Sequence, residues 1–170
     1  MSTDDILRFA DRVGVFDLMN SAWGWPIVES LHFIGLCLLI GTVGVFDLRL
    51  LGLGRGIPIG SLHRLVPFGV GGYLLNVATG TLFFISAPAQ YLYNPAFQLK
   101  MTAMAIAGVN VAVFYTTMAR RVGRLDPQAD APVYAKVVAL VSLLSWAGVI
   151  SFGRLLTFFR PPYHWCFWCS

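Results

Sequence analysis

Charged residues are scarce in this chain of 170 residues. Asp, Glu, Lys and Arg together make up 12% of it, whereas 57% of its residues are hydrophobic. A soluble domain contains about 25% charged residues, so the composition excludes an ordinary soluble protein and predicts an integral membrane protein. The formal net charge of +4 does not indicate nucleic-acid binding, because the basic residues stand at the ends of apolar runs, as in membrane proteins.

Glutamate is the rarest charged residue, because Glu29 is its one occurrence. It stands beside His32 near the start of the apolar run 25–46. A charged residue at the centre of a membrane helix costs about 2.5 to 3.5 kcal/mol on insertion scales, so such groups usually mark a site. The i, i+3 spacing places both side chains on one helix face, within reach of a hydrogen bond. We therefore predict that this pair belongs to the functional site.

Cysteine is also rare, and two of the three cysteines are close to the C-terminus. Cys166 and Cys169 form a Cys-x-x-Cys pair that would be a disulfide, a redox pair or, with His164, half of a metal site. Covalent c-type haem is excluded, because Ser170 and not histidine follows the second cysteine. Cys37 is predicted to face lipid or the core and to be inert.

The apolar runs predict an all-α fold, a four-helix transmembrane bundle with an N-terminal amphipathic interfacial helix, in a single membrane domain over 1–170. A core about 30 Å thick requires about 20 helical residues, and the runs expected to cross it are 25–46, 65–86, 97–118 and 133–158. Residues 3–20 predict one amphipathic helix that lies on the membrane surface or packs on a partner subunit. The N-terminus lacks the pattern of a signal peptide, so the first span is expected to direct insertion.

Basic residues predict the orientation. They are concentrated in the first and third loop regions, at Arg49, Arg55, Arg64, Arg120, Arg121, Arg124 and Lys136. The positive-inside rule therefore places these loops in the cytoplasm and both termini in the periplasm of a bacterial inner membrane. Asp47 and Arg49, at the end of the first span, predict an ion pair or a contact with the helix end.

Alternating spans place four ionisable residues in one outer layer of the bundle. Glu29 and His32 on the first span, Lys100 on the third and Arg154 on the fourth are expected at similar depth, given the rise of 1.5 Å per residue. Tyr91 lies in the connection just above them. Two interpretations of this layer are open. In the first, Glu29 forms a structural ion pair with Arg154 or Lys100. In the second, the layer holds a metal ion or a haem group.

A haem site assigns a role to each of these residues. His32 would be an axial ligand of the iron, with Lys100, Met101 or Met104 as the second, and Glu29 would orient the imidazole. Arg154 and Tyr91 suit the haem propionates. Two histidine ligands from this chain are not expected, because His63 lies at the opposite face and His164 in the tail. Di-iron chemistry is excluded, because it requires several glutamates.

Three motifs resemble a family of uncharacterised four-span bacterial integral membrane proteins, a domain of unknown function. They are Pro26-Ile-Val-Glu29-Ser-Leu-His32-Phe-Ile-Gly35, Asp47-Leu-Arg49-Leu-Leu-Gly52 and Asn94-Pro-Ala-Phe97-Gln-Leu-Lys100. The resemblance covers nearly the whole chain after the N-terminal helix and implies the fold but no chemistry. More distantly, the layout is similar to HemJ-type haem-binding membrane proteins (protoporphyrinogen oxidases). By this similarity, the histidine on an early span and the lysine at the start of a later span of that family correspond to His32 and Lys100. The other histidines of that family have no counterpart here. The layout is also similar to copper-resistance D-type membrane proteins.

These observations lead us to expect a haem b-binding membrane protein for electron transfer. It would be the membrane anchor subunit of a periplasmic oxidoreductase, or would pass electrons between quinone and a partner. Its expected partners are the lipid bilayer and other membrane or periplasmic subunits. One alternative is an ion, proton or copper transporter, in which Glu29 and His32 bind the ion and Cys166 and Cys169 capture copper. The other is a purely structural subunit of a membrane complex. No catalytic residue set is predicted.

Overall fold

The computed structural model describes residues 3–123, 125–126 and 128–158. Within these ranges the chain is all-α and contains no strand, which confirms the predicted fold class. Four segments are long and apolar enough to cross a membrane. The second of them also includes the short helices α4 (Ile59–Leu62) and η1 (His63–Leu65), which precede its long helix. The long helices are α3 (Gly24–Leu50), α5 (Val66–Ser86), α7 (Pro95–Thr117) and α9 (Val133–Phe158).

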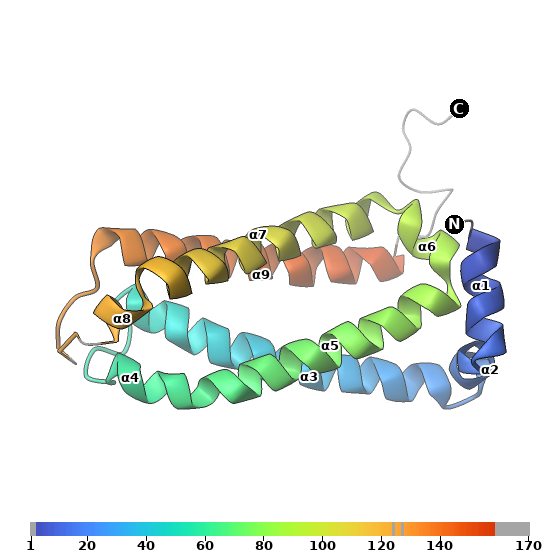
Figure 1. Ribbon diagram of the computed structural model, residues 1–170, viewed down its shortest axis with the longest axis horizontal. Helices are drawn as coiled ribbons and strands as arrows, with labels where there is room; N and C mark the ends of the chain where they lie inside the picture. Colours follow the sequence, from blue (N-terminus) through green and yellow to red (C-terminus); the bar gives the residue numbers. More distant parts are fainter. Residues whose placement is uncertain (1–2, 124, 127, 159–170) are drawn as a thin grey trace.

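The four long helices run alternately up and down and pack as two pairs. Figure 1 shows α3 beside α5 along the lower edge and α7 beside α9 along the upper edge. Contacts between α3 and α9 join the pairs, whereas α5 and α7 share almost no close contact. We call the end of the bundle that carries α1 the α1 end, and the opposite end, with α4, the α4 end. The starts of α3 and α7 and the ends of α5 and α9 meet at the α1 end (Figure 1).

Glycine allows α3 and α5 to cross at very short range. A Cβ added at Gly72 would lie 2.5 Å from the carbonyl oxygen of Gly35, and one added at Gly35 would lie 2.6 Å from Nδ2 of Asn76. Both contacts are shorter than carbon side chains tolerate, so only glycine fits at either position. The close approach predicted for small residues in membrane helices is therefore found at this crossing.

The N-terminal segment forms two helices, α1 (Thr3–Arg12) and α2 (Val15–Asn20), and not the single helix predicted over 3–20. The chain turns at Gly14, whose φ of 73° lies in the left-handed region that favours glycine. Ile6 and Ala10 are buried where α1 packs on α5 and on the short helix α6 (Pro88–Leu92). The helix lies across the α1 end of the bundle, roughly perpendicular to the long helices (Figure 1).

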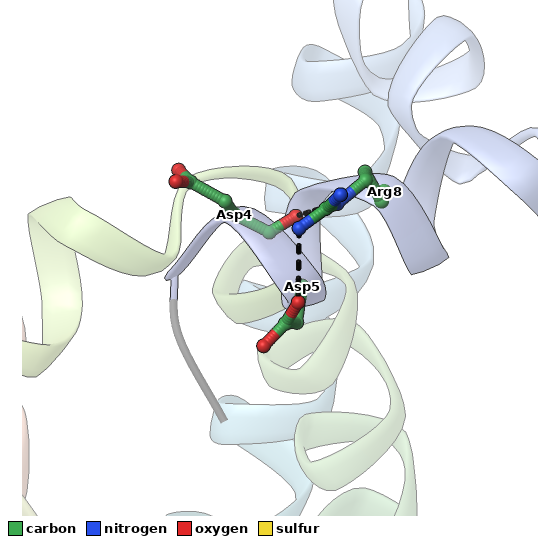
Figure 2. A network of polar contacts seen from close by, with 3 residues as sticks. All are labelled: Asp4, Asp5 and Arg8. Atoms are coloured by element: carbon green, nitrogen blue, oxygen red, sulfur yellow. Dashed lines mark hydrogen bonds and ion pairs between the residues drawn. The ribbon is translucent and has the colours of Figure 1, made fainter.

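The exposed face of α1 carries its charges. Figure 2 shows Arg8 folded back over the first turn, where Nη2 lies 3.1 Å from Oδ1 of Asp5 and Nε donates to the carbonyl oxygen of Asp4 at 3.4 Å. These side chains are largely exposed, and pairs of this kind contribute less than about 1 kcal/mol. They therefore keep one face of α1 polar while the apolar face packs on the bundle.

Polar contacts fold the connections at the α4 end. Arg49 is buried, and its Nε donates to the carbonyl oxygen of Ile57 at 2.9 Å. Asp130 contacts Lys136 at 2.6 Å and Arg55 at 3.4 Å, joining the connection after α3 to the start of α9. The hydrogen bond from Lys136, helped by the nearby Arg55, lowers the pKa of Asp130. The ion pair predicted between Asp47 and Arg49 is not formed, because residues two apart on a helix do not face each other.

Candidate functional site

His32 of α3 is held by a residue of the neighbouring helix α5. Its Nδ1 lies 2.7 Å from Oγ1 of Thr79, a buried side chain one helix away. The edge of the imidazole packs against the ring of Phe83, at 5.7 Å between centroids, and Phe83 in turn packs against Trp25. The imidazole therefore has a fixed position in an aromatic environment near the α1 end.

The contacts of Thr79 are the basis on which we assign the proton of His32 to one of its two nitrogens. The single hydroxyl proton of Thr79 is donated to the carbonyl oxygen of Leu75 at 2.7 Å, as is usual for threonine within a helix. Its oxygen is then an acceptor, so we assign the proton of the neutral imidazole to Nδ1 of His32. The lone pair is consequently on Nε2, which is the arrangement found in metal-ligating histidines whose other nitrogen is hydrogen-bonded.

Lys100 and Arg154 reach the same end of the bundle from the second helix pair. The Lys100 side chain packs against Gly153 of α9, where an added Cβ would make an ordinary van der Waals contact with Nζ at 3.6 Å. The Lys100 ammonium is also close enough to His32 to interact with it electrostatically. Arg154 is exposed, and its Cζ lies 4.9 Å from the centre of the Phe158 ring. His32, Lys100 and Arg154 thus lie at the same end of the bundle, and Arg154 is exposed there.

Glu29 is half-buried and has no hydrogen bond or ion pair with any described residue. The hydrogen bond that orients His32 therefore comes from Thr79 and not from Glu29. Ion pairs of Glu29 with Lys100 or Arg154 are likewise absent from the part of the chain that the structure describes. The simple ion-pair interpretation of this layer consequently has no support in the geometry.

The remaining predicted site residues are dispersed. Tyr91 packs in an aromatic cluster with Phe84 and Phe97. Met101 is 43% exposed, whereas Met104 is turned inward, against the buried cluster around Trp146.

No group of three or more His, Cys, Asp or Glu that could hold a metal ion is found in the described ranges, the surroundings of His32 included. His164, Cys166 and Cys169 lie outside the described residues. His63 lies at the α4 end, packed between Phe46 and Tyr115, as far from His32 as the sequence predicts.

Thr79 is the site residue that sequence reasoning missed. Polar residues within membrane spans commonly form hydrogen bonds between helices, as Thr79 does here and as Asn110 does, whose Nδ2 donates to the carbonyl oxygen of Val138 at 3.0 Å. The depth of Thr79 in the membrane follows from its position along α5. Its contact with His32 also depends on how α5 is rotated about its own axis, which the sequence does not reveal.

Comparison of the chain with protein-family models, with curated proteins and with solved structures finds no match. The four candidate membrane-spanning helices agree with the four-span architecture that the sequence resemblance implies. The chemistry of the site must therefore be inferred from its own residues.

Proposed function

We propose that the protein binds haem b near the α1 end, with Nε2 of His32 as an axial ligand. The observation that carries this proposal is the hydrogen bond between His32 and Thr79. It fixes the imidazole with its second nitrogen available for a metal, and such outer contacts orient most metal-bound histidines in proteins. The donor set fits haem, which takes one or two axial ligands, better than a metal ion that needs three or four side chains.

The other residues of the layer supply what a haem group needs around it. Lys100, near His32, would be the second axial ligand, and the exposed guanidinium of Arg154 at the rim would pair with a propionate. Phe83 and Trp25 provide apolar surface beside the imidazole. A haem bound here would carry single electrons through the membrane domain, while the protein sets ligation and polarity.

Absorption spectroscopy tests this proposal directly. The protein purified in mild detergent, after expression with adequate haem supply, is expected to show a Soret band and a reduced-minus-oxidised difference spectrum. Absence of both from the purified chain and from its native membranes would refute haem binding.

The distribution of basic residues supports a bacterial inner membrane location with the α1 end in the periplasm. Arg49, Arg55 and Arg64 are at the α4 end, and the positive-inside rule assigns that end to the cytoplasm. A periplasmic partner subunit would then meet the protein at the α1 end, on the side of His32. In this arrangement the chain acts as a membrane anchor that passes electrons to or from that partner.

Labelling of single cysteines in intact cells checks the orientation. In a variant with Cys37, Cys166 and Cys169 replaced by serine, Tyr93→Cys places an exposed thiol at the α1 end and Ser61→Cys one at the α4 end. A membrane-impermeant maleimide is expected to label Tyr93→Cys in intact cells and Ser61→Cys only after permeabilisation. The reverse pattern would invert the proposed topology.

A second candidate function is supported by Glu29, which lies in a membrane-spanning helix without a partner among the described residues. Unpaired acidic residues within membranes commonly bind ions or relay protons, so Glu29 and His32 would form an ion or proton site in a transporter. Bound copper or another metal without haem, lost in Glu29→Ala and His32→Ala, would favour this candidate. Retention of all partner activity by both variants would instead favour a structural subunit.

A further inference from the structure

A second site lies within the bundle, away from His32. A cavity of about 400 Å³ is lined by residues of α3, α5, α7 and α9 between the middle of the bundle and the α4 end. Tyr73 of α5 and Tyr115 of α7 line it and are also exposed, by 40% and 48%. Because α5 and α7 share almost no close contact, these two residues place its opening between α5 and α7, toward the lipid. Glu29, His32, Lys100 and Arg154 do not line it.

Two polar atoms at the cavity wall have no hydrogen-bond partner within the described part of the chain. They are Oδ2 of Asp47 on α3 and Nε1 of Trp146 on α9, and both side chains are more than nine-tenths buried. A buried polar group without a partner is destabilising, and in native proteins it calls for an explanation. Here one atom is an acceptor and the other is a donor.

Asp47 is one of the polar residues that line the cavity, although its Oδ2 atom is covered by protein. The Ser142 side chain, one helical turn before Trp146 on the same helix, lines the same cavity and lies close enough to the Asp47 carboxyl group to interact with it. No basic side chain forms an ion pair with Asp47 in the described ranges. Asp47 and Trp146 therefore belong to one polar strip on an otherwise apolar and aromatic wall, which includes Phe46 and Phe114.

The chemistry of the two atoms restricts the ligand. With Asp47 as a carboxylate, a lipid tail satisfies neither atom, a lipophilic ammonium ion satisfies only Asp47, and a quinone, which lacks a hydrogen-bond donor, satisfies only Trp146. A hydroquinone has hydroxyl groups that donate to a carboxylate and oxygens that accept from an indole N–H. Its ring suits the aromatic wall, its tail suits an opening toward lipid, and the volume lies within the usual range for small-molecule sites.

We propose that this cavity binds the head group of a lipid-soluble hydroquinone, with Asp47 accepting a hydrogen bond from one hydroxyl and Trp146 donating to a ligand oxygen. Both protein atoms are covered in this structure, so the two side chains rotate slightly when the ligand enters. The site is independent of the proposed haem, because the residues around His32 form no part of it. Binding at Asp47 and Trp146 can therefore be measured whether or not a haem is present.

Titration calorimetry of the full-length protein in lipid nanodiscs tests the proposal. Decyl-substituted benzohydroquinone, kept reduced without oxygen, is expected to bind at least tenfold more tightly than the matching benzoquinone. Asp47→Leu is expected to weaken hydroquinone binding by about tenfold or more, the effect of losing a hydrogen bond to a charged group. Trp146→Phe, which loses only the N–H donor, is expected to weaken it by a few-fold.

Asp47→Asn provides the sharpest readout, because the amide keeps the shape of the side chain but adds a donor. Its preference for hydroquinone over quinone is expected to shrink or reverse, which a merely structural role would not produce. The matched controls Asp130→Asn and Trp23→Phe, both outside the cavity, should bind like the unmodified protein. Unchanged preference in Asp47→Asn, or binding of decylammonium in place of the hydroquinone, would overturn the proposal.

Discussion

Replacement of His32 by alanine is expected to abolish the Soret band of the purified protein. Among the described residues His32 is the one histidine near the α1 end, and Thr79 hydrogen-bonds to its Nδ1, so Nε2 is the nitrogen that the proposed haem would use. Without it, Lys100 would be left as a single ligand, and haem would be lost during purification. The measurement is the ratio of haem to protein, from the pyridine haemochrome spectrum and the protein concentration.

A graded series separates ligation from general damage to the bundle. Thr79→Val keeps the shape of the side chain but removes the acceptor for Nδ1, and loss of such an outer contact typically reduces metal affinity by 10- to 100-fold. Thr79→Ser restores the acceptor and should restore most of the haem. His63→Ala, at the opposite end of the bundle, is the matched control and should keep its full haem content. An unchanged Soret band in His32→Ala would rule out His32 as the ligand.

Replacement of Gly72 by alanine is expected to destabilise the bundle strongly. The added Cβ would lie 2.5 Å from the carbonyl oxygen of Gly35 and 2.8 Å from the backbone nitrogen of Leu39. Both are backbone atoms, so the helices themselves must separate, and overpacking of this kind costs about 1 to 3 kcal/mol. Thermal unfolding in detergent, followed by circular dichroism, should show a clearly lower midpoint for this variant.

The neighbouring glycine is the control for this experiment. A Cβ at Gly71 meets nothing within 4 Å, so Gly71→Ala changes the same residue type in the same helix without a clash. Its midpoint is expected to equal or slightly exceed that of the unmodified protein, because alanine favours helix over glycine. Equal midpoints for Gly71→Ala and Gly72→Ala would show that α3 and α5 do not cross as closely in the membrane.

The same crossing links stability to the proposed site. His32 and Thr79 are each one or two turns from Gly35 and Gly72 along their helices, so separation of α3 from α5 would also lengthen the hydrogen bond between them. We therefore expect Gly72→Ala to lose haem in part, whereas Gly71→Ala keeps it. This coupling can be read from the same purified samples.

The spans could be predicted because insertion into a membrane depends on the length and polarity of local segments. The expected spans 25–46 and 133–158 correspond to α3 and α9 with few changes in their bounds. The break at Gly14 was missed, since the apolar spacing continues across it and indicates a continuous helix. Its cause is a local backbone conformation that spacing does not reveal.

The sequence by itself determined four membrane-spanning helices, and it predicted that Glu29, His32, Lys100 and Arg154 lie toward one end of the bundle. Depth in a membrane follows from position along a helix, at 1.5 Å per residue. Tertiary structure alone decided which side chains touch, because contacts depend on the rotation and crossing of helices, which are set by packing at residues such as Gly72. It paired His32 with Thr79, left Glu29 without a partner among the described residues, and brought Asp47 to the wall of a cavity with Trp146.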